Sequence, residues 1–345
     1  MNGTITKSII GVHTVSRMFA AAIVGLSSAS TFAEPPIESF LADAPANFIP
    51  PPIHPAGAQL QTKQLGEGVY ALLSGLPAVD NSGFIVGERG VLVVDAHVNA
   101  EMAGQIQDAV RRVTDKPILY LVNTNYHGDH TFGNYAFPKE TLIVAHRNTA
   151  EHMQHFELEK EFMLPTVDGD RSVFSDAELR LPDIAFDKYL RLDLGGRFVE
   201  LHYFGRGNTP GDTIVFEPQT RTAWTGNLVV GAGTIPPLFE GGVDAYLQTI
   251  SRFAQTLEVT TIIPGHGAPA TGLILGRYLR YLTELKISVR GAIDEGQTAD
   301  EAITSLPLGA EYLPPRDAPQ AALIPFLQGL HSLNVQRTYR DLTAR

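Results

Sequence analysis

A polar stretch rich in asparagine and histidine reads Asn123-Thr124-Asn125-Tyr126-His127-Gly128-Asp129-His130-Thr131-Phe132-Gly133-Asn134. It follows an apolar run over residues 118–122, which predicts a buried strand. Gly128 lets the backbone turn sharply, so several polar side chains can converge at the end of that strand. Imidazole and carboxylate groups are the usual nitrogen and oxygen ligands of zinc. The stretch therefore predicts a metal site where the strand ends.

The surrounding sequence predicts strands and helices in two β-rich halves. Short apolar runs separated by glycine turns predict strands over 69–73, 83–86 and 91–94, with further strands at 118–122 and 142–144. Several short strands are expected within 183–229 and one at 261–263, while helices are expected over 99–113, 145–162, 244–257, 271–294 and 318–343. In the first helix, Met102, Ile106 and Val110 share one face. Two β-rich halves that each end in helices predict two packed sheets with helices outside.

A lone histidine is more often a satisfied core or surface residue than a ligand, so the prediction depends on the motif as a whole. That motif resembles the signature His-x-His-x-Asp-His of the metallo-beta-lactamase superfamily, with Asn125 in place of the first histidine. Three later segments resemble the family's motifs in the family's order. They are 205–212, with Asn208 in place of a histidine, 224–227, with Asn227 in place of an aspartate, and 264–267, which matches Pro-Gly-His-Gly completely. The earlier segment 93–95 ends in Asp95, like the strand-ending aspartate that is usually a structural group in the family.

The resemblance covers residues from about 69 to 267 and implies an α+β fold, the four-layer αβ/βα sandwich of the metallo-beta-lactamase fold. It also implies two metal positions at the sheet edges. The first uses three histidines, which correspond here to Asn125, His127 and Asn208. The second uses an aspartate and two histidines, and all three are present as Asp129, His130 and His266. The bridging carboxylate corresponds to Asn227.

Three asparagines at ligand positions favour one metal ion over two. An amide oxygen is a neutral donor and binds zinc much more weakly than imidazole does. We therefore expect one Zn²⁺ per chain at Asp129, His130 and His266, with Asn227 as a fourth ligand, although the same donors also suit iron. The three asparagines replace ligands with polar, hydrogen-bonding groups, and this favours a repurposed site over a decayed one.

The catalytic roles follow from this ligand set as hypotheses. Asp129 orients the attacking water, and His127, freed from ligation, is the candidate general base or proton shuttle. Asn125 and Asn208 are expected to bind the substrate or the developing anion. The glycine-bounded apolar loop 231–242 is expected to wall the pocket or to act as a lid, with Phe239 as its specificity residue.

The predicted function is a metal-dependent hydrolase that uses a metal-bound hydroxide on an electrophilic small molecule, which is an ester, a lactone, a β-lactam or an aryl halide. A resemblance to hydrolytic dehalogenases of the superfamily makes dehalogenation one candidate. The alternatives are a dinuclear thioesterase or lactonase, a non-catalytic metal-binding or ligand-binding member with a decayed site, and an iron-dependent redox member. The chain has no cysteine, so its resemblance to mono-zinc carbapenem-hydrolysing lactamases, which rely on a cysteine ligand, is partial.

Composition and the N-terminus bear on partners and location. The 345 residues carry a net charge of −11, which argues against nucleic acid as a partner. The resemblance to the hydrolase family implies a small-molecule substrate. Residues 1–33 have the order of a secretory signal peptide: basic residues, a short apolar run, then small residues ending at Ala33. We expect a Pro-rich arm over 34–58 and one catalytic domain over 59–345, including the C-terminal helices. The mature protein is expected to be periplasmic or secreted, without stable membrane insertion, and its C-terminal helices are compatible with a homo-oligomer.

Overall fold

The computed structural model describes residues 43–344 except 77, 232 and 318. The predicted signal peptide, residues 1–33, and residues 34–42 of the predicted arm lie outside the described residues. The described part of the arm, residues 43–58, contains no helix or strand. No helix in the described part of the chain is long and apolar enough to cross a membrane.

The first sheet has seven strands in chain order, and its second half is parallel. The strands are β1 (Gln61–Gly66), β2 (Val69–Leu73), β3 (Ser82–Val86), β4 (Val91–Val94), β5 (Ile118–Asn123), β6 (Leu142–His146) and β7 (Ile184–Phe186). β1 to β4 pair antiparallel, and β4 to β7 pair parallel. Parallel strands end at the same edge of a sheet, so the loops that follow β4 and β5 emerge side by side.

The second sheet has five strands in the order β12-β11-β10-β9-β8. They are β8 (Tyr189–Asp193), β9 (Phe198–His202), β10 (Ile214–Glu217), β11 (Thr222–Trp224) and β12 (Thr261–Ile263). Only β11 and β12 pair parallel among them, and the other neighbours pair antiparallel. The loops after β11 and β12 therefore also share one edge of their sheet.

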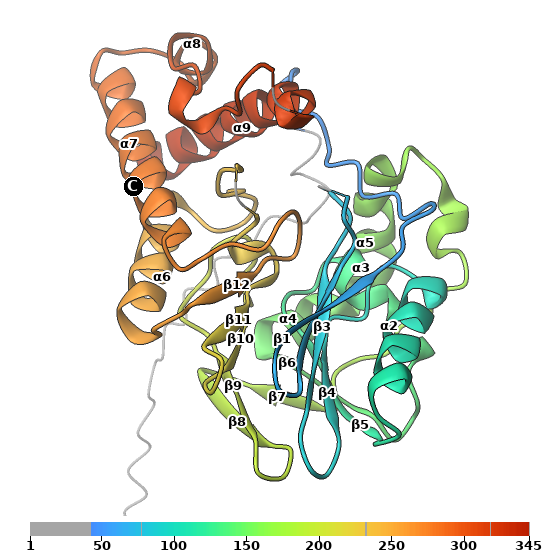
Figure 1. Cartoon of the computed structure of the whole chain (residues 1–345). Helices are drawn as coiled ribbons and strands as arrows, with labels where there is room; N and C mark the ends of the chain where they lie inside the picture. Colours follow the sequence, from blue (N-terminus) through green and yellow to red (C-terminus); the bar gives the residue numbers. More distant parts are fainter. Residues whose placement is uncertain (1–42, 77, 232, 318, 345) are drawn as a thin grey trace, which may run out of the picture. The chain divides into compact units, whose positions relative to one another are not determined.

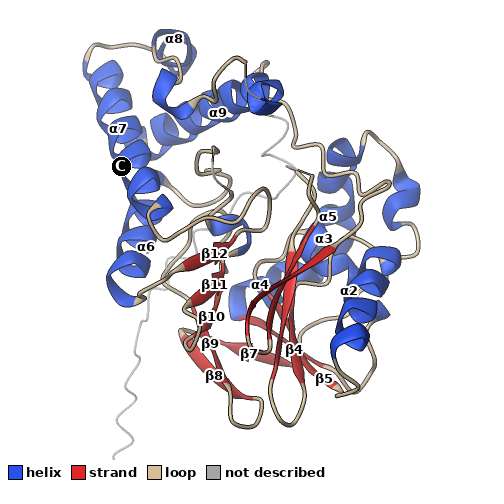
Figure 2. Cartoon of the chain, in the orientation of Figure 1, coloured by secondary structure: helices blue, strands red, loops and turns tan. Residues whose placement is uncertain are grey.

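Helices cover the outer face of each sheet, and the two sheets face one another between them (Figure 2). The α-helices are α2 (Ala100–Val113), α3 (Gly128–Thr131), α4 (Arg147–His152), α5 (Phe156–Met163), α6 (Val243–Thr256), α7 (Ile274–Asp294), α8 (Ala299–Ser305) and α9 (Ile324–Thr343). Short 3₁₀ helices are η1 (Phe132–Ala136), η2 (Met153–His155), η3 (Leu164–Val167), η4 (Arg171–Phe174), η5 (Gly226–Leu228), η6 (Ala310–Tyr312) and η7 (Pro319–Leu323). Figure 1 shows α2 and α5 beside the first sheet, and α6 and α7 beside the second.

Side chains along the strands point alternately to the two faces of each sheet, and this gives three apolar clusters: one between the sheets and one between each sheet and its helices. Val91 and Val93 of β4 pack in the cluster that contains α2, whereas Leu92 packs in the cluster between the sheets. In β10, Val215 faces the same inter-sheet cluster, and its neighbours pack towards α6 and α7. Successive side chains of a strand point to opposite faces, so buried strands with apolar residues on both faces need cover on both. The predicted four-layer sandwich is thus confirmed.

Most predicted elements appear close to their predicted bounds, but one predicted helix is divided, and α3 and α8 were not predicted. The expected helix over 145–162 is divided into α4, η2 and α5, because His155 leaves the helical conformation with φ −87° and ψ 40°. A capping box between Thr298 and Glu301 begins α8. Asn99 caps α2 by accepting a hydrogen bond from the Met102 backbone N–H at 3.0 Å, as its sequence position indicates.

Candidate metal centre

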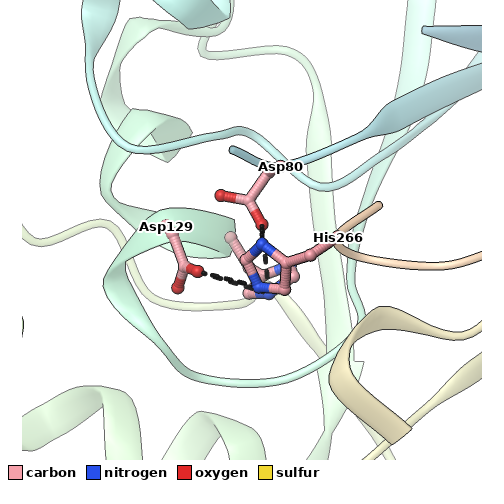
Figure 3. Close-up of side chains that lie close together, drawn as sticks. Asp80, Asp129 and His266 are labelled. Carbon is pink, nitrogen blue, oxygen red and sulfur yellow. Dashed lines mark ion pairs between the residues drawn. The ribbon is translucent and has the colours of Figure 1, made fainter. Parts of the chain in front are cut away.

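Four side chains converge where the loops at the edges of the two sheets meet. Asp80, Asp129, His130 and His266 each offer a ligand atom, and these atoms lie within 4.8 Å of one another. Asp80 precedes β3, and His266 follows β12. Asp129 and His130 lie in α3, directly after β5. Figure 3 shows the carboxylates of Asp80 and Asp129 directed at the imidazole of His266 from two sides. Their oxygens lie 3.3 Å from Nδ1 and 3.4 Å from Nε2 of that ring, respectively.

Asp95 holds the central histidine in place from behind. Its Oδ2 lies 3.0 Å from Nδ1 of His130, while its two oxygens accept hydrogen bonds from the backbone N–H and the hydroxyl of Thr124, both at 2.8 Å. This arrangement turns Nε2 of His130 towards the cluster, 3.6 Å from Oδ1 of Asp80. Asp95 also has a left-handed backbone with φ 60°, a strained conformation for an aspartate. A carboxylate behind a ligating imidazole fixes its orientation and raises its basicity.

Asp80 is a candidate ligand that the sequence did not reveal. The chain segment before β3 is joined to the last motif, because the Asn81 side chain donates hydrogen bonds to the carbonyls of Pro264 at 3.1 Å and Gly267 at 2.8 Å. Asp80 and His266 thereby form an isolated antiparallel bridge. The only signal in the sequence is a short polar group immediately before an apolar strand, and such groups are common.

Asn227 lies beside the cluster, which is the position that its predicted role as a ligand requires. Its Oδ1 is 3.1 Å from Nε2 of His130. The preceding Gly226 has a φ of 49°, and a Cβ there would lie 2.2 Å from the hydroxyl of Thr124. Glycine is therefore required for the loop after β11 to approach the loop after β5 this closely.

His127 stands outside the cluster and pairs with a buried glutamate. Its Nδ1 lies 3.1 Å from Oε1 of Glu159, which also accepts the backbone N–H of Gly128 at 3.0 Å. Burial lowers the pKa of His127, but the carboxylates of Glu159, Asp129 and Glu240 together outweigh it, so the pKa is raised. Nε2 of His127 is buried without a hydrogen-bond partner. Glu159 was not singled out in the sequence, because nothing local distinguishes it from the other acidic residues of its helix.

The other predicted substrate-binding residues occupy the same side as His127. Asn125 is fully buried, and its Oδ1 accepts the backbone N–H of His127 at 2.8 Å, which leaves Nδ2 unpartnered. Asn208 donates Nδ2 to the Pro237 carbonyl at 3.2 Å and keeps an unpartnered Oδ1. The Phe239 ring lies edge-on to the His127 ring, with 6.4 Å between centroids. The roles assigned to these residues, and to Asp129, His130, His266 and Asn227, stay predictions.

The donor set fits a divalent cation. Asp80, Asp95 and Asp129 are each at most 4% exposed, and in the described part of the chain their ion pairs are all with histidines. Burial raises the pKa of Asp80 well above its usual value, and the Asp129 charge adds to this. Burial lowers the pKa of His266 to about 4, which keeps its ring neutral as a ligand must be. Oδ1 atoms of Asp80 and Asp129 have no hydrogen-bond partner. Buried carboxylate oxygens that lack a hydrogen-bond donor, beside a neutral imidazole, are what a metal ion would satisfy.

A pocket opens onto this cluster, and its walls are apolar. Its polar lining consists of His127, Asp129, Asn208, Asn227, His266 and two threonines, Thr166 and Thr234. The other described lining residues are all apolar. They come from the arm, the loop before β3, α5, the loop after η5, and the C-terminal elements η7 and α9. Phe239 lines this pocket, as predicted for the loop 231–242. Asn125 is not among the described lining residues.

The chain is similar in sequence to a known family of proteins. Residues 77–266, just over half of the chain, match the family model of the metallo-beta-lactamase superfamily. The chain belongs to this superfamily, whose members are mostly hydrolases. A metallo-beta-lactamase type 2 from Bacteroides fragilis is 23% identical over 215 residues, which cover 59% of this chain and 78% of that relative. The chain is a divergent member, since Asn125, Asn208 and Asn227 replace usual ligands.

Solved structures share the fold at low sequence identity. A metallo-beta-lactamase from Pontibacter korlensis superposes with a TM-score of 0.54 and 18% identity, covering 65% of this chain and 99% of that one. The inverting sec-alkylsulfatase Pisa1 from Pseudomonas sp. gives a TM-score of 0.60 at 15% identity, over 82% of this chain. The matched region is only 50% of that sulfatase chain. These similarities support the fold alone.

The hydrogen bond from Asp95 to His130 generates a prediction about metal affinity. We expect Asp95→Asn to lower zinc affinity about 10-fold to 100-fold, because the amide keeps the shape but not the charge behind His130. Competition with a chromophoric chelator measures this. Asp115→Asn, at an exposed position, is the matched control and should bind zinc like the wild type. Equal affinity in both variants would contradict the orienting role of Asp95.

Asp212 generates a prediction about pH. Burial raises its pKa from 3.8 to about 7, although Thr209 donates two hydrogen bonds to its carboxylate at 2.8 and 3.0 Å. The folded protein then holds this proton more tightly than the unfolded chain does. The free energy of unfolding from this group is therefore greatest below about pH 4 and falls by about 1.4 kcal/mol per pH unit towards pH 7.

Asp212→Asn should remove this contribution. Urea unfolding of the wild type and of Asp212→Asn at several pH values gives two curves of unfolding free energy against pH. The same chelator in all samples keeps both proteins free of metal. We expect the difference between them to change with pH across that window. Parallel curves would show that Asp212 titrates alike in the folded and unfolded states.

Proposed function

We propose that the protein is an exported metal-dependent hydrolase that holds one zinc ion and acts on an electrophilic small molecule. Esters, lactones, β-lactams and aryl halides are the substrate classes to test. One observation carries the proposal: the described residues contain a single group of acidic and histidine ligands, Asp80, Asp129, His130 and His266, and it faces a pocket that also contains His127.

The asymmetry of the site supports one metal ion. The side that corresponds to the family's first metal position presents Asn125, His127 and Asn208. The side chains of both asparagines already hydrogen-bond to the protein backbone. His127 spends its Nδ1 on Glu159. The opposite side keeps its carboxylates and imidazoles aimed at one point. Three protein ligands, with a fourth position left for water, are typical of catalytic zinc.

Each polar group beside the cluster has an assignable task in hydrolysis. When bound, zinc lowers the pKa of a water ligand to about 7 and supplies a nucleophile at neutral pH. The free Oδ1 of Asp129 can accept a hydrogen bond from the attacking water and orient it. His127, held by Glu159, can take up or release a proton through its unpartnered Nε2. Asn208 lines the pocket, and its unpartnered amide oxygen can accept a hydrogen bond from the substrate. Asn125 is not among the described residues that line the pocket and acts through His127, whose backbone N–H it holds.

Export is proposed from the sequence of the first 33 residues. Lys7 and Arg17 precede a short apolar run, and small residues lead to Ala33. Cleavage there would place the mature chain in the periplasm or outside the cell.

Metal content tests the proposal directly. Elemental analysis of the zinc-reconstituted protein should give about one zinc per chain. Asp129→Ala, His130→Ala and His266→Ala should each lose that zinc, because each removes a ligand from a small set. His155→Ala, at an exposed position, is the control and should keep it.

Other stoichiometries would point elsewhere. Two metal ions per chain would mean that the asparagine side also ligates, and dinuclear thioesterase or lactonase chemistry would replace this proposal. A protein that binds no metal after reconstitution would be a ligand-binding member of the superfamily. Iron with a visible absorption band would favour redox chemistry instead.

His127 is tested by turnover in a metal-loaded variant. We expect His127→Ala to keep its zinc and to lose about 10²-fold to 10⁴-fold in kcat towards a neutral para-nitrophenyl ester, because a proton-transfer group is removed. Glu159→Gln should give a smaller loss, since it removes only the group that orients the imidazole. Full turnover by a metal-loaded His127→Ala protein would exclude the role.

A further inference from the structure

The N-terminal arm, residues 43–58, is fixed over the metal centre by contacts at both of its ends. Near its start, Asn47 donates a hydrogen bond to the Ser332 hydroxyl of α9 at 2.9 Å, and the Asp43 carbonyl accepts one from Gln336 at 2.8 Å. Further on, the Ile53 backbone N–H donates to the Thr166 carbonyl of η3 at 2.9 Å. In Figure 1 this segment, in blue, runs from α9 towards α5 before it enters β1.

Gly329 allows the arm to lie directly on α9. A Cβ at this helical position would be 2.3 Å from the Asn47 carbonyl oxygen and 3.1 Å from the Phe48 Cα. Gly276 in α7 has no atom within 4 Å of its would-be Cβ. The cost of a glycine within a helix is about 1 kcal/mol relative to alanine. At position 329, this cost is offset by the close approach of the arm.

The arm and α9 add an apolar wall to the pocket above the metal centre. Phe48 and Ile53 come from the arm, and Phe326 and Leu330 come from α9. The ring of Phe48 also meets the ring of Phe239 edge-on, with 6.4 Å between centroids. Phe239 reaches the His127 ring in turn, so the aromatic contacts run from the arm to the metal centre.

The described lining of the pocket contains no lysine or arginine. Its titratable residues are His127, Asp129 and His266, which all belong to the floor. A carboxylate, sulfate or phosphate on the substrate would therefore enter this wall without a counter-ion, and burying an unpaired charge is costly. An ammonium group would lose its hydration in the same way.

We infer that the arm and α9 complete a substrate chamber that selects an uncharged, predominantly apolar molecule and excludes substrates with a charged group beyond the reacting centre. The reaction at the floor of the chamber rests on the function proposed above. The selectivity of the wall does not, since it concerns binding and can be measured with molecules that do not react.

The test compares three unreactive probes with matched chains on the zinc-reconstituted full-length protein. Octanol is uncharged, its ω-amino analogue is a cation at neutral pH, and its ω-carboxy analogue is an anion. Isothermal titration should show octanol binding at least about tenfold more tightly than either charged analogue, equivalent to about 1.4 kcal/mol. Equal or tighter binding of a charged analogue would overturn the inference, even if the protein proves to be a hydrolase.

Variants locate the effect in the arm. Gly329→Ala and Phe48→Ala should each weaken octanol binding about tenfold or more, with zinc content unchanged. Gly276→Ala is the matched control for the first, and Ile287→Ala, at an exposed residue of α7, is the control for the second. If both pocket variants fold, keep zinc and bind octanol like wild type, the arm does not form the chamber wall.

The outcomes also separate this inference from the proposed function. Selective octanol binding by a protein that hydrolyses none of the tested classes would leave the chamber standing and remove the hydrolase. Hydrolysis of charged and neutral esters at similar kcat/KM would keep the hydrolase and remove the chamber's selectivity.

Discussion

The burial of three carboxylates around one histidine is the constraint on which the rest of the structure depends. Asp80, Asp95 and Asp129 surround His130 without a lysine or arginine among their ion-pair partners in the described chain. Buried charge without compensation costs several kcal/mol, so this arrangement requires positive charge at its centre. The surrounding loops accordingly come from the coincident edges of two sheets and are fixed by backbone hydrogen bonds, such as that from Thr124 to Asp95. The four-layer fold provides those edges.

The two halves of the site have different chemistry as a result. On the cluster side, one carboxylate oxygen of Asp80 and one of Asp129 have no hydrogen-bond donor, which suits them to bind a cation. On the other side, Asn125 fastens the backbone of His127, and Glu159 fastens its ring. Amides suit this second task because they donate and accept hydrogen bonds without adding charge. Asn125 and Asn208 therefore have definite contacts, with the His127 backbone and the Pro237 carbonyl, and these contacts favour the proposed repurposed site over a decayed one.

The sequence predicted the parts of the site that are local. Apolar runs and glycine turns located most strands, and two family motifs placed Asp129, His130 and His266, which the structure brings together. Asp80 escaped prediction because its partner His266 is 186 residues away and their bridge depends on how the sheets pack. Glu159 escaped for the same reason: it is one acidic residue among several in α5, and only tertiary packing buries it against His127. Long-range contacts of this kind leave no periodicity in a single sequence.

The division between family-wide and individual features also follows the chain. Residues 77–266 match the family model and contain all four candidate ligands. Phe48, Phe326 and Leu330 lie outside that range, yet they form the wall above the ligands. Membership of the superfamily therefore indicates what the floor of the pocket can do and carries no information about which molecule reaches it. Substrate choice in this protein is better sought in the flanking segments, where an arm without secondary structure is held in place by its contacts with α9 and with η3.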